Sequence, residues 1–546
     1  MLKLKKVSFS YTEKDETFTV TTERSVSNDR MSLDIDNNCD IITVMIHTDN
    51  EIQINHLSAV FEYPFTESDK IFLNGYQSWT DSIEHGINDS MRGIDHLPDR
   101  LNEKYGFSQY GDYNLINYAN YPGIMHGWTY GYVRNGNEYD FFGSLAEKSG
   151  FTAIVVSTEK NEIQFQKDCN GHTINSDYCG LKLMISSDSE DSVFDQYFKL
   201  LNIKIRDNVR PLFGYTSWYR HYQNISEDIL IDDLEALTDQ GNKADIFQID
   251  DGWQAHVGDW LSVNEEKFSS GMAAIADKIK EKGLQPGLWI APFVCEKDSD
   301  IFQNNEKWIL KDDENRYIKG GSNWSGCYAL DIYDNDFREY LRKVFHTVIH
   351  EWGFTFLKLD FLYAACIQQR EDRTRGQVMA DAMEFLREIS DGALLLGCGV
   401  PLGSAFGMVD YCRIGCDVSL DWNDKPHLRI LHRERISTRN SILNSVFRRQ
   451  LDGRAFYNDP DVFMLRDEET TMTHAQKQCL AEINAMMGSV LFTSDNLNDY
   501  DETTLKILKK IFLLRNAKVI SADLIGDFLI IKFSIGDKKF IRKYKV

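Results

Sequence analysis

The sequence predicts a multidomain protein of α/β and β class, with an N-terminal β-sandwich, a central (β/α)8 TIM barrel and a small C-terminal β-sheet domain. Three observations predict this order. Apolar and polar residues alternate over roughly the first 200 residues, strand-like and helix-like runs interleave over about the next 290, and strand alternation returns in about the last 40. We therefore place the domains at residues 1–205, 206–505 and 506–546.

The N-terminal part is expected to consist of antiparallel strands. Its segments alternate apolar and polar residues, and short Gly, Asn and Asp clusters separate them, as in FTVTTERSV, DIITVMIHT and FTAIVVSTEKNEIQFQ. Two facing sheets would bury these apolar faces against one another, which predicts a sandwich. The segment SVFDQYFKLLNIK then predicts a helix that leads out of this domain.

The central part begins near Val209-Arg210-Pro211. Eight short apolar runs follow, namely LFGYTSWY, ADIFQIDDGW, QPGLWIAPF, FTFLKLDF, GALLLGCG, VDYCRIGCDV, GRAFYNDPDVF and SVLFTSDNL. Helical stretches lie between most of them, which predicts the barrel. The third-to-fourth connection is long and predicts an excursion over the barrel mouth, whereas the fifth-to-sixth leaves room for only a stub of helix. A doubly wound sheet is the alternative, but no GxGxxG loop follows a strand.

The composition excludes several classes of protein. Against 60 Lys and Arg stand 84 Asp and Glu, a net charge of −24, which argues against nucleic-acid or anionic-membrane partners. No stretch approaches the roughly 18–20 apolar residues of a membrane span, and no apolar run that would mark a secretory signal follows the start MLKLKKVSFSYT. The 10 cysteines fit neither a disulfide scaffold nor zinc-knuckle spacing, so we expect reduced thiols in a cytoplasmic protein.

Polar and aromatic residues gather where the predicted barrel strands end. Because reactive groups of such barrels lie at the C-terminal ends of the strands, these residues are the candidates for chemistry. They are Trp218 and Tyr219 on strand one, Asp250, Asp251 and Trp253 on strand two, Trp289 on strand three, Lys358 and Asp360 on strand four, and Arg413 and Asp417 on strand six.

Lys358 and Asp360 stand two residues apart, so they project from the same face of an otherwise apolar strand. The nearby cation would keep Asp360 ionised, while Lys358 would keep donors for a ligand hydroxyl. Asp360 is therefore a candidate nucleophile. A structural ion pair at a strand end is the alternative.

Asp417 supplies a second carboxylate from a different strand, and such a pair is what glycoside hydrolysis requires. One would act as nucleophile and the other as general acid and then base. Asp421 and Asp424 lie close in sequence and compete for the acid role. An Asp that only caps a turn is the common structural alternative.

The adjacent Asp250 and Asp251 would be unfavourable if both were buried and ionised without donors. Sugar hydroxyls could supply those donors. A turn in which one Asp caps and the other is solvated is the alternative. A metal site is less favoured, because no His or further carboxylate stands at ligand-like spacing.

Aromatic residues could stack on the apolar face of a sugar ring, although core packing is the commoner role of any single Trp. The candidates are Trp79, Trp218, Tyr219, Trp253 and Trp289. Trp79 belongs to the first domain, in the turn-like segment NGYQSW. If Trp79 contributes to the site, that domain must lean over the barrel mouth.

The motifs together resemble one known family. NGYQSW, FGYTSWY, FQIDDGW, GLWIAPF, FLKLDF, GCGVPLGSAFGMVDYCRIGCDV and NDPDVF resemble those of the family 36 glycoside hydrolases, the melibiase-type α-galactosidases. The likeness runs from about Asn74 to about Leu497, and the strand-end motifs occur in the family's order.

The resemblance implies roles for individual positions. Asp360 resembles the family's nucleophile and Asp417 its acid/base. Asp250 and Asp251 resemble the carboxylates that accept bonds from the 4- and 6-hydroxyls of galactose, and Lys358 resembles the lysine that reaches the 3- and 4-hydroxyls.

Further positions resemble the walls of the family's sugar pocket. Arg413 and Cys398 correspond to residues near O2 of the sugar, and the remaining walls correspond to Trp79, Trp218, Tyr219 and Trp289. The family needs no metal and no organic cofactor, so none is expected here.

The implied activity is that of a retaining exo-α-galactosidase, which releases terminal α-D-galactosyl residues from oligosaccharides such as melibiose and raffinose through a covalent galactosyl-enzyme. Retention needs the two carboxyl groups about 5–5.5 Å apart, against roughly 6.5–9.5 Å for inversion. An α-N-acetylgalactosaminidase, an α-galactosyl transglycosylase and a non-catalytic sugar-binding protein remain alternatives. We expect an oligosaccharide substrate, no nucleic-acid or membrane partner, and a monomer or small homo-oligomer.

Overall fold

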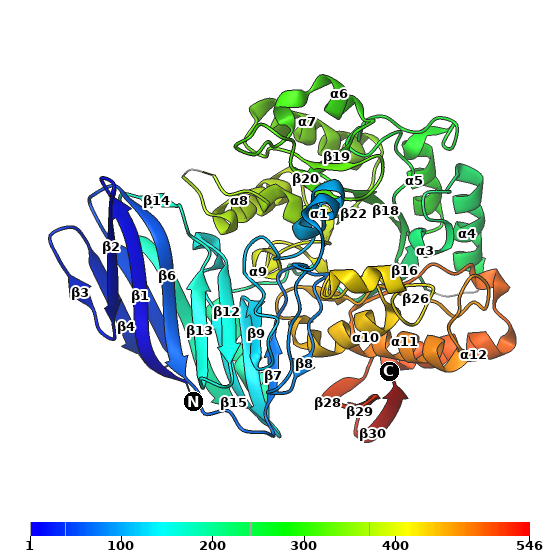
Figure 1. Cartoon of the computed structure of the whole chain (residues 1–546). Coiled ribbons are helices and arrows are strands. Elements are labelled where there is room, and N and C mark those ends of the chain that lie inside the picture. The colour runs from blue at the N-terminus through cyan, green and yellow to red at the C-terminus, as the bar shows by residue number, and fades with distance from the viewer. Residues whose placement is uncertain (1, 39, 240–242, 371) are drawn as a thin grey trace.

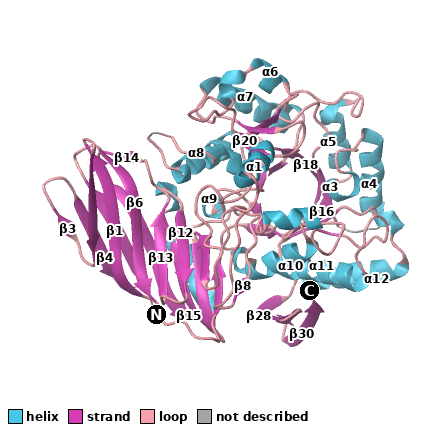
Figure 2. Cartoon of the chain, viewed as in Figure 1, coloured by secondary structure: helices cyan, strands magenta, loops and turns pink. Residues whose placement is uncertain are grey.

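The computed structural model describes residues 2–38, 40–239, 243–370 and 372–546. Two large antiparallel sheets form the N-terminal side of the molecule, and a part in which helices surround parallel strands lies beside them (Figure 1). A three-stranded sheet near the C-terminus lies below that second part (Figure 2). The predicted multidomain organisation of β and α/β parts is therefore confirmed at this level.

The first N-terminal sheet runs β2 (Glu16–Thr22), β1 (Lys3–Glu13), β6 (Ile52–Glu62), β13 (Glu162–Lys167), β12 (Thr152–Ser157) and β9 (Ile124–Trp128), with β14 (Thr173–Ile174) also paired to β6. The second runs β3 (Val26–Ser27), β4 (Ser32–Asn38), β5 (Ile41–His47), β15 (Tyr178–Asp188), β11 (Glu138–Ser144), β10 (Tyr130–Asn135), β7 (Lys70–Leu73) and β8 (Glu84–His85).

The alternation in the sequence sets which face of each strand is buried. In β1, Val7, Phe9 and Tyr11 are buried, while the serines between them are half-buried. Side chains of both sheets, such as Phe9 of the first and Val44 of the second, belong to one apolar core. Burial of these faces against each other is the main force that holds the sheets together.

The helix α2 (Glu190–Leu200) follows the last strand of the second sheet, where the sequence predicts a helix. An insertion over residues 86–123 carries α1 (Asp99–Tyr105) and the 3-10 turn η1 (Phe107–Gln109) away from the sheets and onto the α/β part (Figure 1). Lys319 Nζ donates to the carbonyl of Lys104 at this contact.

The central parallel sheet runs β25 (Tyr457–Asp459), β24 (Tyr411–Arg413), β23 (Leu394–Gly397), β22 (Phe356–Leu359), β18 (Gln285–Ile290), β17 (Ile246–Ile249), β16 (Leu212–Thr216), β27 (Val490–Thr493) and β26 (Val462–Phe463). The first and last of these strands are two halves of one segment, divided at Pro460-Asp461. The two edges of the sheet are therefore joined through this one segment. Most of its strands are buried along their whole length, as strands covered on both faces are.

Helices accompany this sheet in chain order: α3 (Trp218–His221), α4 (Glu227–Asp239), α5 (Gly271–Glu281), α6 (Asp300–Asn304), α7 (Asn335–His346), α8 (Arg375–Ile389), α9 (Leu402–Ala405), α10 (Thr438–Phe447), α11 (His474–Met487) and α12 (Glu502–Leu514). The T-x-x-Q sequences at Thr374 and Thr473 form capping boxes that begin α8 and α11. The four-residue α9 is the short helix expected between the fifth and sixth strands.

A long excursion separates β18 and β22, the third and fourth parallel strands in chain order, as expected. It holds a small antiparallel sheet of β19 (Val294–Glu296), β21 (Cys327–Ala329) and β20 (Lys319–Gly321). At the C-terminus, β28 (Lys518–Ile525), β29 (Phe528–Ile535) and β30 (Lys538–Lys545) form an antiparallel meander. Leu529, Ile531 and Phe533 bury one face of it.

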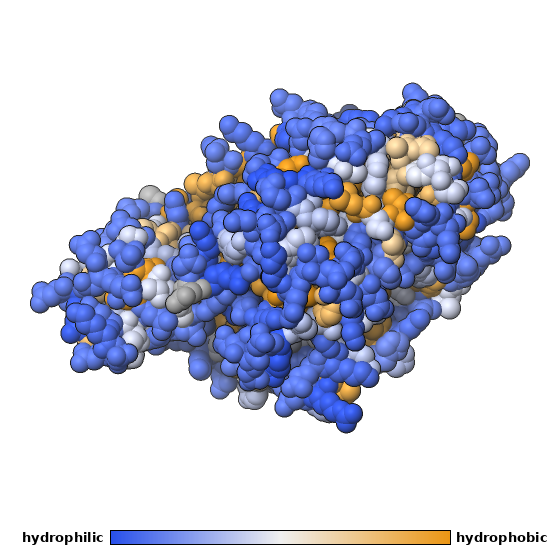
Figure 3. All heavy atoms as spheres, turned by 90° about the horizontal axis from the view of Figure 1, so that it is seen from above, coloured by the Kyte–Doolittle hydropathy of each residue, from blue (hydrophilic) through white to orange (hydrophobic). Residues whose placement is uncertain are grey.

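The surface seen in Figure 3 is mostly hydrophilic, with apolar residues in small separate areas. No helix within the described ranges has the length and apolarity that a bilayer crossing needs. The nine described cysteines are free thiols, and the tenth, Cys39, lies outside the described residues.

Candidate active site

A cavity of about 430 Å³ opens at the carboxyl ends of the parallel strands. Most of the predicted site residues line it: Trp79, Trp218, Tyr219, Asp250, Asp251, Trp289, Lys358, Asp360 and Asp417. Cys398 and Arg413 are buried and contact lining residues, since Cys398 touches Trp79 and Arg413 binds Asp417. The structure therefore gathers these eleven residues in one place, whereas the further candidate Trp253 does not line the cavity.

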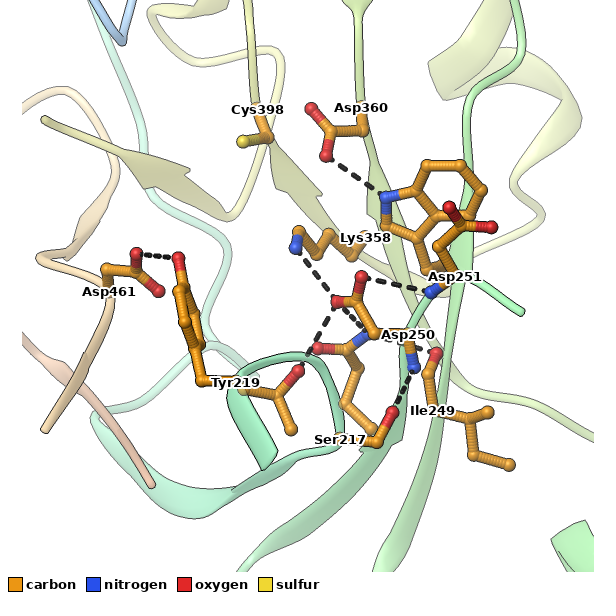
Figure 4. Close-up of polar contacts among 12 residues, drawn as sticks. Ser217, Tyr219, Ile249, Asp250, Asp251, Lys358, Asp360, Cys398 and Asp461 are labelled. Carbon is orange, nitrogen blue, oxygen red and sulfur yellow. Dashed lines mark hydrogen bonds and ion pairs between the residues drawn. The ribbon is translucent and has the colours of Figure 1, made fainter. Parts of the chain in front are cut away.

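Asp250 and Lys358 form a buried ion pair at the inner end of this cavity (Figure 4). Lys358 Nζ donates to Asp250 Oδ2 at 2.9 Å, and Gln248 Nε2 donates to the same oxygen at 3.0 Å. Burial opposes ionisation of Asp250, but the Lys358 charge and these donors outweigh it and lower the carboxyl pKa. Asp250 is therefore a carboxylate at neutral pH.

The sequence predicted Lys358 as the cation near Asp360, and the structure adds a direct contact of Lys358 with Asp250. The strand β22 ends at Leu359, so Asp360 already lies beyond it, whereas Lys358 reaches past β18 to the end of β17. Burial lowers the pKa of Lys358, but Asp250 first and Asp360 second raise it well above the ordinary value. Lys358 therefore remains a cation that interacts with both carboxylates.

Asp360 is held by two neutral donors. Trp289 Nε1 donates to Oδ2 at 3.0 Å, and the backbone N–H of Phe361 donates to Oδ1 at 2.9 Å. Phe361 has a φ of +54°, a left-handed conformation that is uncommon for a residue with a side chain. Such strain concentrates at functional sites, and here it accompanies the N–H that faces Asp360. Asp360 is only 7% exposed, and its carboxylate is directed into the cavity.

Asp251 lies beside Asp250 but has a different environment. Its oxygens accept from Gln254 Nε2 at 2.6 Å, from Gln223 Nε2 at 2.8 Å and from Trp324 Nε1 at 2.9 Å. All three donors are neutral, and burial raises the pKa of this carboxyl. The two neighbouring acids therefore differ in proton affinity because only Asp250 has a cation in contact.

Asp417 faces the cavity from the segment after β24, and its side chain is 33% exposed. Arg413 Nη1 donates to Asp417 Oδ1 at 2.7 Å, while its other nitrogens bind Asp459 and Asp461 at 3.3 and 3.0 Å. Burial, with the nearby Asp461 and Asp360 charges, outweighs the Arg413 cation and raises the pKa of Asp417 to about 6.

The two rival acids are engaged elsewhere. Asp421 accepts a hydrogen bond from the Thr471 hydroxyl at 2.7 Å. Asp424 lies 3.5 Å from Arg429 and 3.4 Å from Arg435. Neither residue lines the cavity.

The Trp79 turn of the first β part lies at the cavity, as a role for Trp79 requires. Trp79 Nε1 lies 3.2 Å from Cys398 Sγ, and its ring packs edge-on against Phe361. Arg448, fully buried, donates to Asn74 Oδ1 and to the carbonyls of Gly75, Gln77 and Ser78, and also to that of Ile414. One guanidinium thus joins the turn to the strand end that precedes Asp417.

Other residues of the site escaped sequence reasoning. Tyr219 donates its hydroxyl to Asp461, a residue of the quoted NDPDVF motif to which no role was given. Loops supply the other lining residues that had not been predicted, among them Phe107, Tyr110, Gln223, Trp324, Leu428, Leu431, Glu434 and Arg435. Trp253, by contrast, is in the core, packed against Trp260 and Trp352.

The cavity combines the carboxyl groups of Asp360 and Asp417, which have different hydrogen-bond partners, with further carboxylates, an ammonium group and indole rings. Such a pair is the arrangement that separates an acid from a nucleophile at neutral pH. The remaining groups suit hydroxyls and the apolar face of a sugar. Within the described ranges, no group of three or more His, Cys, Asp or Glu side chains is placed to hold a metal ion.

Comparisons with known proteins agree with this chemistry. The family model described as Melibiase matches residues 188–382. The α-galactosidase Mel36A of Lactobacillus acidophilus is 27% identical over 180 residues, which are 30% of this chain and 23% of that protein. TtGalA, an α-galactosidase of Thermus thermophilus solved with p-nitrophenyl α-D-galactopyranoside, superposes with a TM-score of 0.73 at 25% identity, over 93% of this chain and 96% of that one. These likenesses support a melibiase-type glycoside hydrolase of family 36.

The likeness of this chain to known structures extends beyond the segment that the family model matches. The family model ends at residue 382, before Arg413 and Asp417, whereas the likeness to TtGalA covers 93% of the chain. The family 36 α-galactosidase AgaA of Geobacillus stearothermophilus shares the fold, with a TM-score of 0.62 at 12% identity over 94% of this chain and 73% of that one. The segment matched to Mel36A spans about a quarter of that relative's length.

Proposed function

We propose that this chain is a retaining exo-α-galactosidase that hydrolyses terminal α-D-galactosyl residues of oligosaccharides. The observation that carries the proposal is the pair Asp360 and Asp417, which line one cavity and differ in environment. Asp360 is held by two N–H donors, while the pKa of Asp417 is raised to about 6. We further infer that the closed parallel sheet is a (β/α)8 barrel, with domain limits at residues 1–205, 206–505 and 506–546.

In the proposed first step, a carboxylate oxygen of Asp360 bonds to the anomeric carbon as the bond from that carbon to the leaving oxygen breaks. Asp417 gives its proton to that oxygen. In the second step, Asp417 takes a proton from water, the water oxygen bonds to the anomeric carbon, and the ester bond to Asp360 breaks. Two displacements retain the configuration, and they require carboxyl groups about 5–5.5 Å apart.

The sugar would be held by the inner end of the cavity. Asp250 and Asp251 would accept bonds from the 4- and 6-hydroxyls, and Lys358 would donate to the 3- and 4-hydroxyls. Trp289 and Trp218 would border the ring, and Cys398 with Arg413 would lie near O2. The complexes of TtGalA with p-nitrophenyl α-D-galactopyranoside and with stachyose support a galactoside as substrate. The nine free thiols support a reducing, cytoplasmic location.

A panel of substrates tests the proposal. Aryl α-galactoside, melibiose and raffinose should be hydrolysed. The kcat/KM for aryl α-glucoside and α-N-acetylgalactosaminide should be lower by roughly two orders of magnitude, because the glucoside directs its 4-hydroxyl differently and the acetamido group replaces the 2-hydroxyl and adds bulk. Proton NMR of the early product should show α-galactose. Early β-galactose would contradict retention, and preference for the acetamido substrate would replace galactose with N-acetylgalactosamine. Products longer than the substrate at high acceptor concentration would identify a transglycosylase instead.

A further inference from the structure

The cavity has an outer end that differs in origin from the inner one. Three loops build it: residues 107–110 of the first β part, residues 322–324 of the excursion, and residues 428–436. The last segment belongs to the connection between β24 and α10, which also carries Asp417. A general acid donates to the leaving oxygen, so the leaving group must begin on the Asp417 side of the cavity. The connection that carries the acid therefore also borders the leaving group.

Two buried polar atoms of segment 428–436 lack hydrogen-bond partners. Glu434 Oε1 accepts from the Thr80 hydroxyl at 2.6 Å, but Glu434 Oε2 is buried and has no hydrogen-bond partner among the described residues. The same holds for Arg435 Nε. Leaving a buried polar atom unpaired costs roughly 1–3 kcal/mol, so such atoms usually have a reason. Both residues line the cavity, although the two atoms themselves are covered by protein, so a small turn of either side chain toward a bound group would give its atom a partner.

The surroundings indicate what kind of group would bind. Phe107, Leu428 and Leu431 line the same end, and Ile436, 40% exposed, borders it. Burial raises the pKa of Glu434 well above its ordinary value, and nearby Asp112 adds to the effect, so the carboxyl is neutral and has a hydrogen to donate. A carboxyl and a guanidinium beside an aromatic ring match a sugar unit, which has hydroxyls on its rim and C–H groups on its faces.

The first β part holds this connection in place. Arg433 donates to the carbonyls of Asp81 at 3.1 Å and His126 at 3.3 Å, and the Tyr113 hydroxyl donates to the carbonyl of Leu431. Gly111 packs against Glu434 so closely that an added Cβ would lie 2.6 Å from its Oε1. The outer end is thus fixed before a ligand arrives, which reduces the ordering that binding requires.

We propose that Glu434 and Arg435, with Phe107, form a binding site for the leaving sugar, and that this site selects an uncharged, hydroxyl-rich hexose unit. The inference rests on the proposed α-galactosidase activity and names the residues that decide its leaving-group specificity. Glu434 and Arg435 touch the released unit, not the reacting carbon, so they are specificity-determining residues.

The test compares a leaving group that fills the outer end with one that does not. Arg435→Met and Glu434→Ala should each lower kcat/KM for raffinose and melibiose roughly tenfold or more, the loss of about one hydrogen bond to a charged or buried group. The same variants should hydrolyse α-galactosyl fluoride, which loses a single atom, within about threefold of the unchanged enzyme. Arg429→Met is the matched control, because Arg429 also faces Asp424 but is 60% exposed and does not line the cavity.

Equal losses on fluoride and raffinose would overturn the inference, because they would place both residues in the machinery common to all substrates. Unchanged raffinose hydrolysis in both variants would overturn it as well. If Glu434→Ala fails to fold, as a melting curve would reveal, Arg435→Met alone decides. An unchanged enzyme that does not hydrolyse α-galactosyl fluoride would contradict the proposed function itself, which keeps the two failures distinct.

Discussion

The inner and outer ends of the cavity differ in the elements that supply their residues and in how fully the polar atoms of those residues are hydrogen-bonded. At the inner end, Asp250, Asp251 and Asp360 come from strand ends, and each accepts at least two hydrogen bonds from neighbouring groups. At the outer end, Glu434 and Arg435 come from a loop, and each keeps a polar atom without a partner. Strand ends fix groups rigidly, whereas loops vary without loss of the fold. The comparison supports the proposal that the chemistry takes place at the inner end and leaving-group selection at the outer one.

The largest effect should follow from removal of the proposed nucleophile. Asp360→Ala should lower kcat on aryl α-galactoside roughly 10⁴-fold or more, because no carboxylate remains to attack the anomeric carbon. The melting temperature should change little, since groups at the barrel mouth contribute more to chemistry than to stability. Steady-state assays and a melting curve measure both. Near-normal turnover would place the chemistry elsewhere.

Removal of the proposed acid should have a smaller effect that depends on the leaving group. Asp417→Ala should lower kcat/KM on melibiose roughly 10²–10⁴-fold, the usual contribution of a general acid, and affect activated aryl galactosides less. Azide, which needs no base, should restore turnover and give a galactosyl azide. Asp421→Asn and Asp424→Asn are the controls, because both acids bind other partners. Azide rescue in either control, and not in Asp417→Ala, would move the acid role to that residue.

The pH profile should report the proton on Asp417. Its pKa of about 6 means that the acid is protonated below that pH, so kcat/KM for melibiose should fall as pH rises through about 6, roughly tenfold per unit beyond it. The fluoride needs less protonation of its leaving group, so its profile should be flatter. A melibiose profile that stays level to pH 8 would be inconsistent with Asp417 as the acid.

The link between the Trp79 turn and the barrel should show a moderate effect. Arg448 makes its hydrogen bonds to an amide oxygen and four backbone carbonyls, and lysine has too few donors to replace them. Arg448→Lys should raise KM for aryl galactoside several-fold, as expected for the loss of one contact. In a double-mutant cycle, it should raise KM little further when Trp79→Ala is already present. Fully additive effects would mean that Arg448 stabilises the fold without orienting Trp79.

The smallest effect should be on stability. The pKa of Asp417 is raised above that of an unfolded chain, so its neutral form stabilises the fold at low pH, and this contribution is lost as pH rises from about 4 to about 6. Asp417→Asn should therefore raise the melting temperature at pH 7 and have less effect at pH 4, as calorimetry can measure. If Asp417→Asn changed the melting temperature equally at pH 4 and pH 7, ionisation of Asp417 would not destabilise the fold.

Much of the architecture could be predicted because it follows from local periodicity. The alternation in β1 and the apolar run around Lys358 indicate which side chains are buried. Burial in turn decides where each strand lies and ends. The rule that reactive groups follow strand ends then located Asp250, Asp251, Asp360 and Asp417. Trp79 was a candidate only as an aromatic residue in a turn-like segment that resembles a family motif, since no periodicity links that turn to the parallel strands.

Only the tertiary structure decided which groups pair. Lys358 binds Asp250 on a strand two places away, and Trp253 enters the core although its motif lies beside the cavity. Trp324, Glu434 and Arg435 belong to loops whose positions depend on contacts with distant segments, such as Thr80 with Glu434. The spacing of apolar and polar residues along the chain predicts which face of a strand is buried and where the strand ends. Contacts between loops that are hundreds of residues apart arise from packing in three dimensions, which no local pattern encodes.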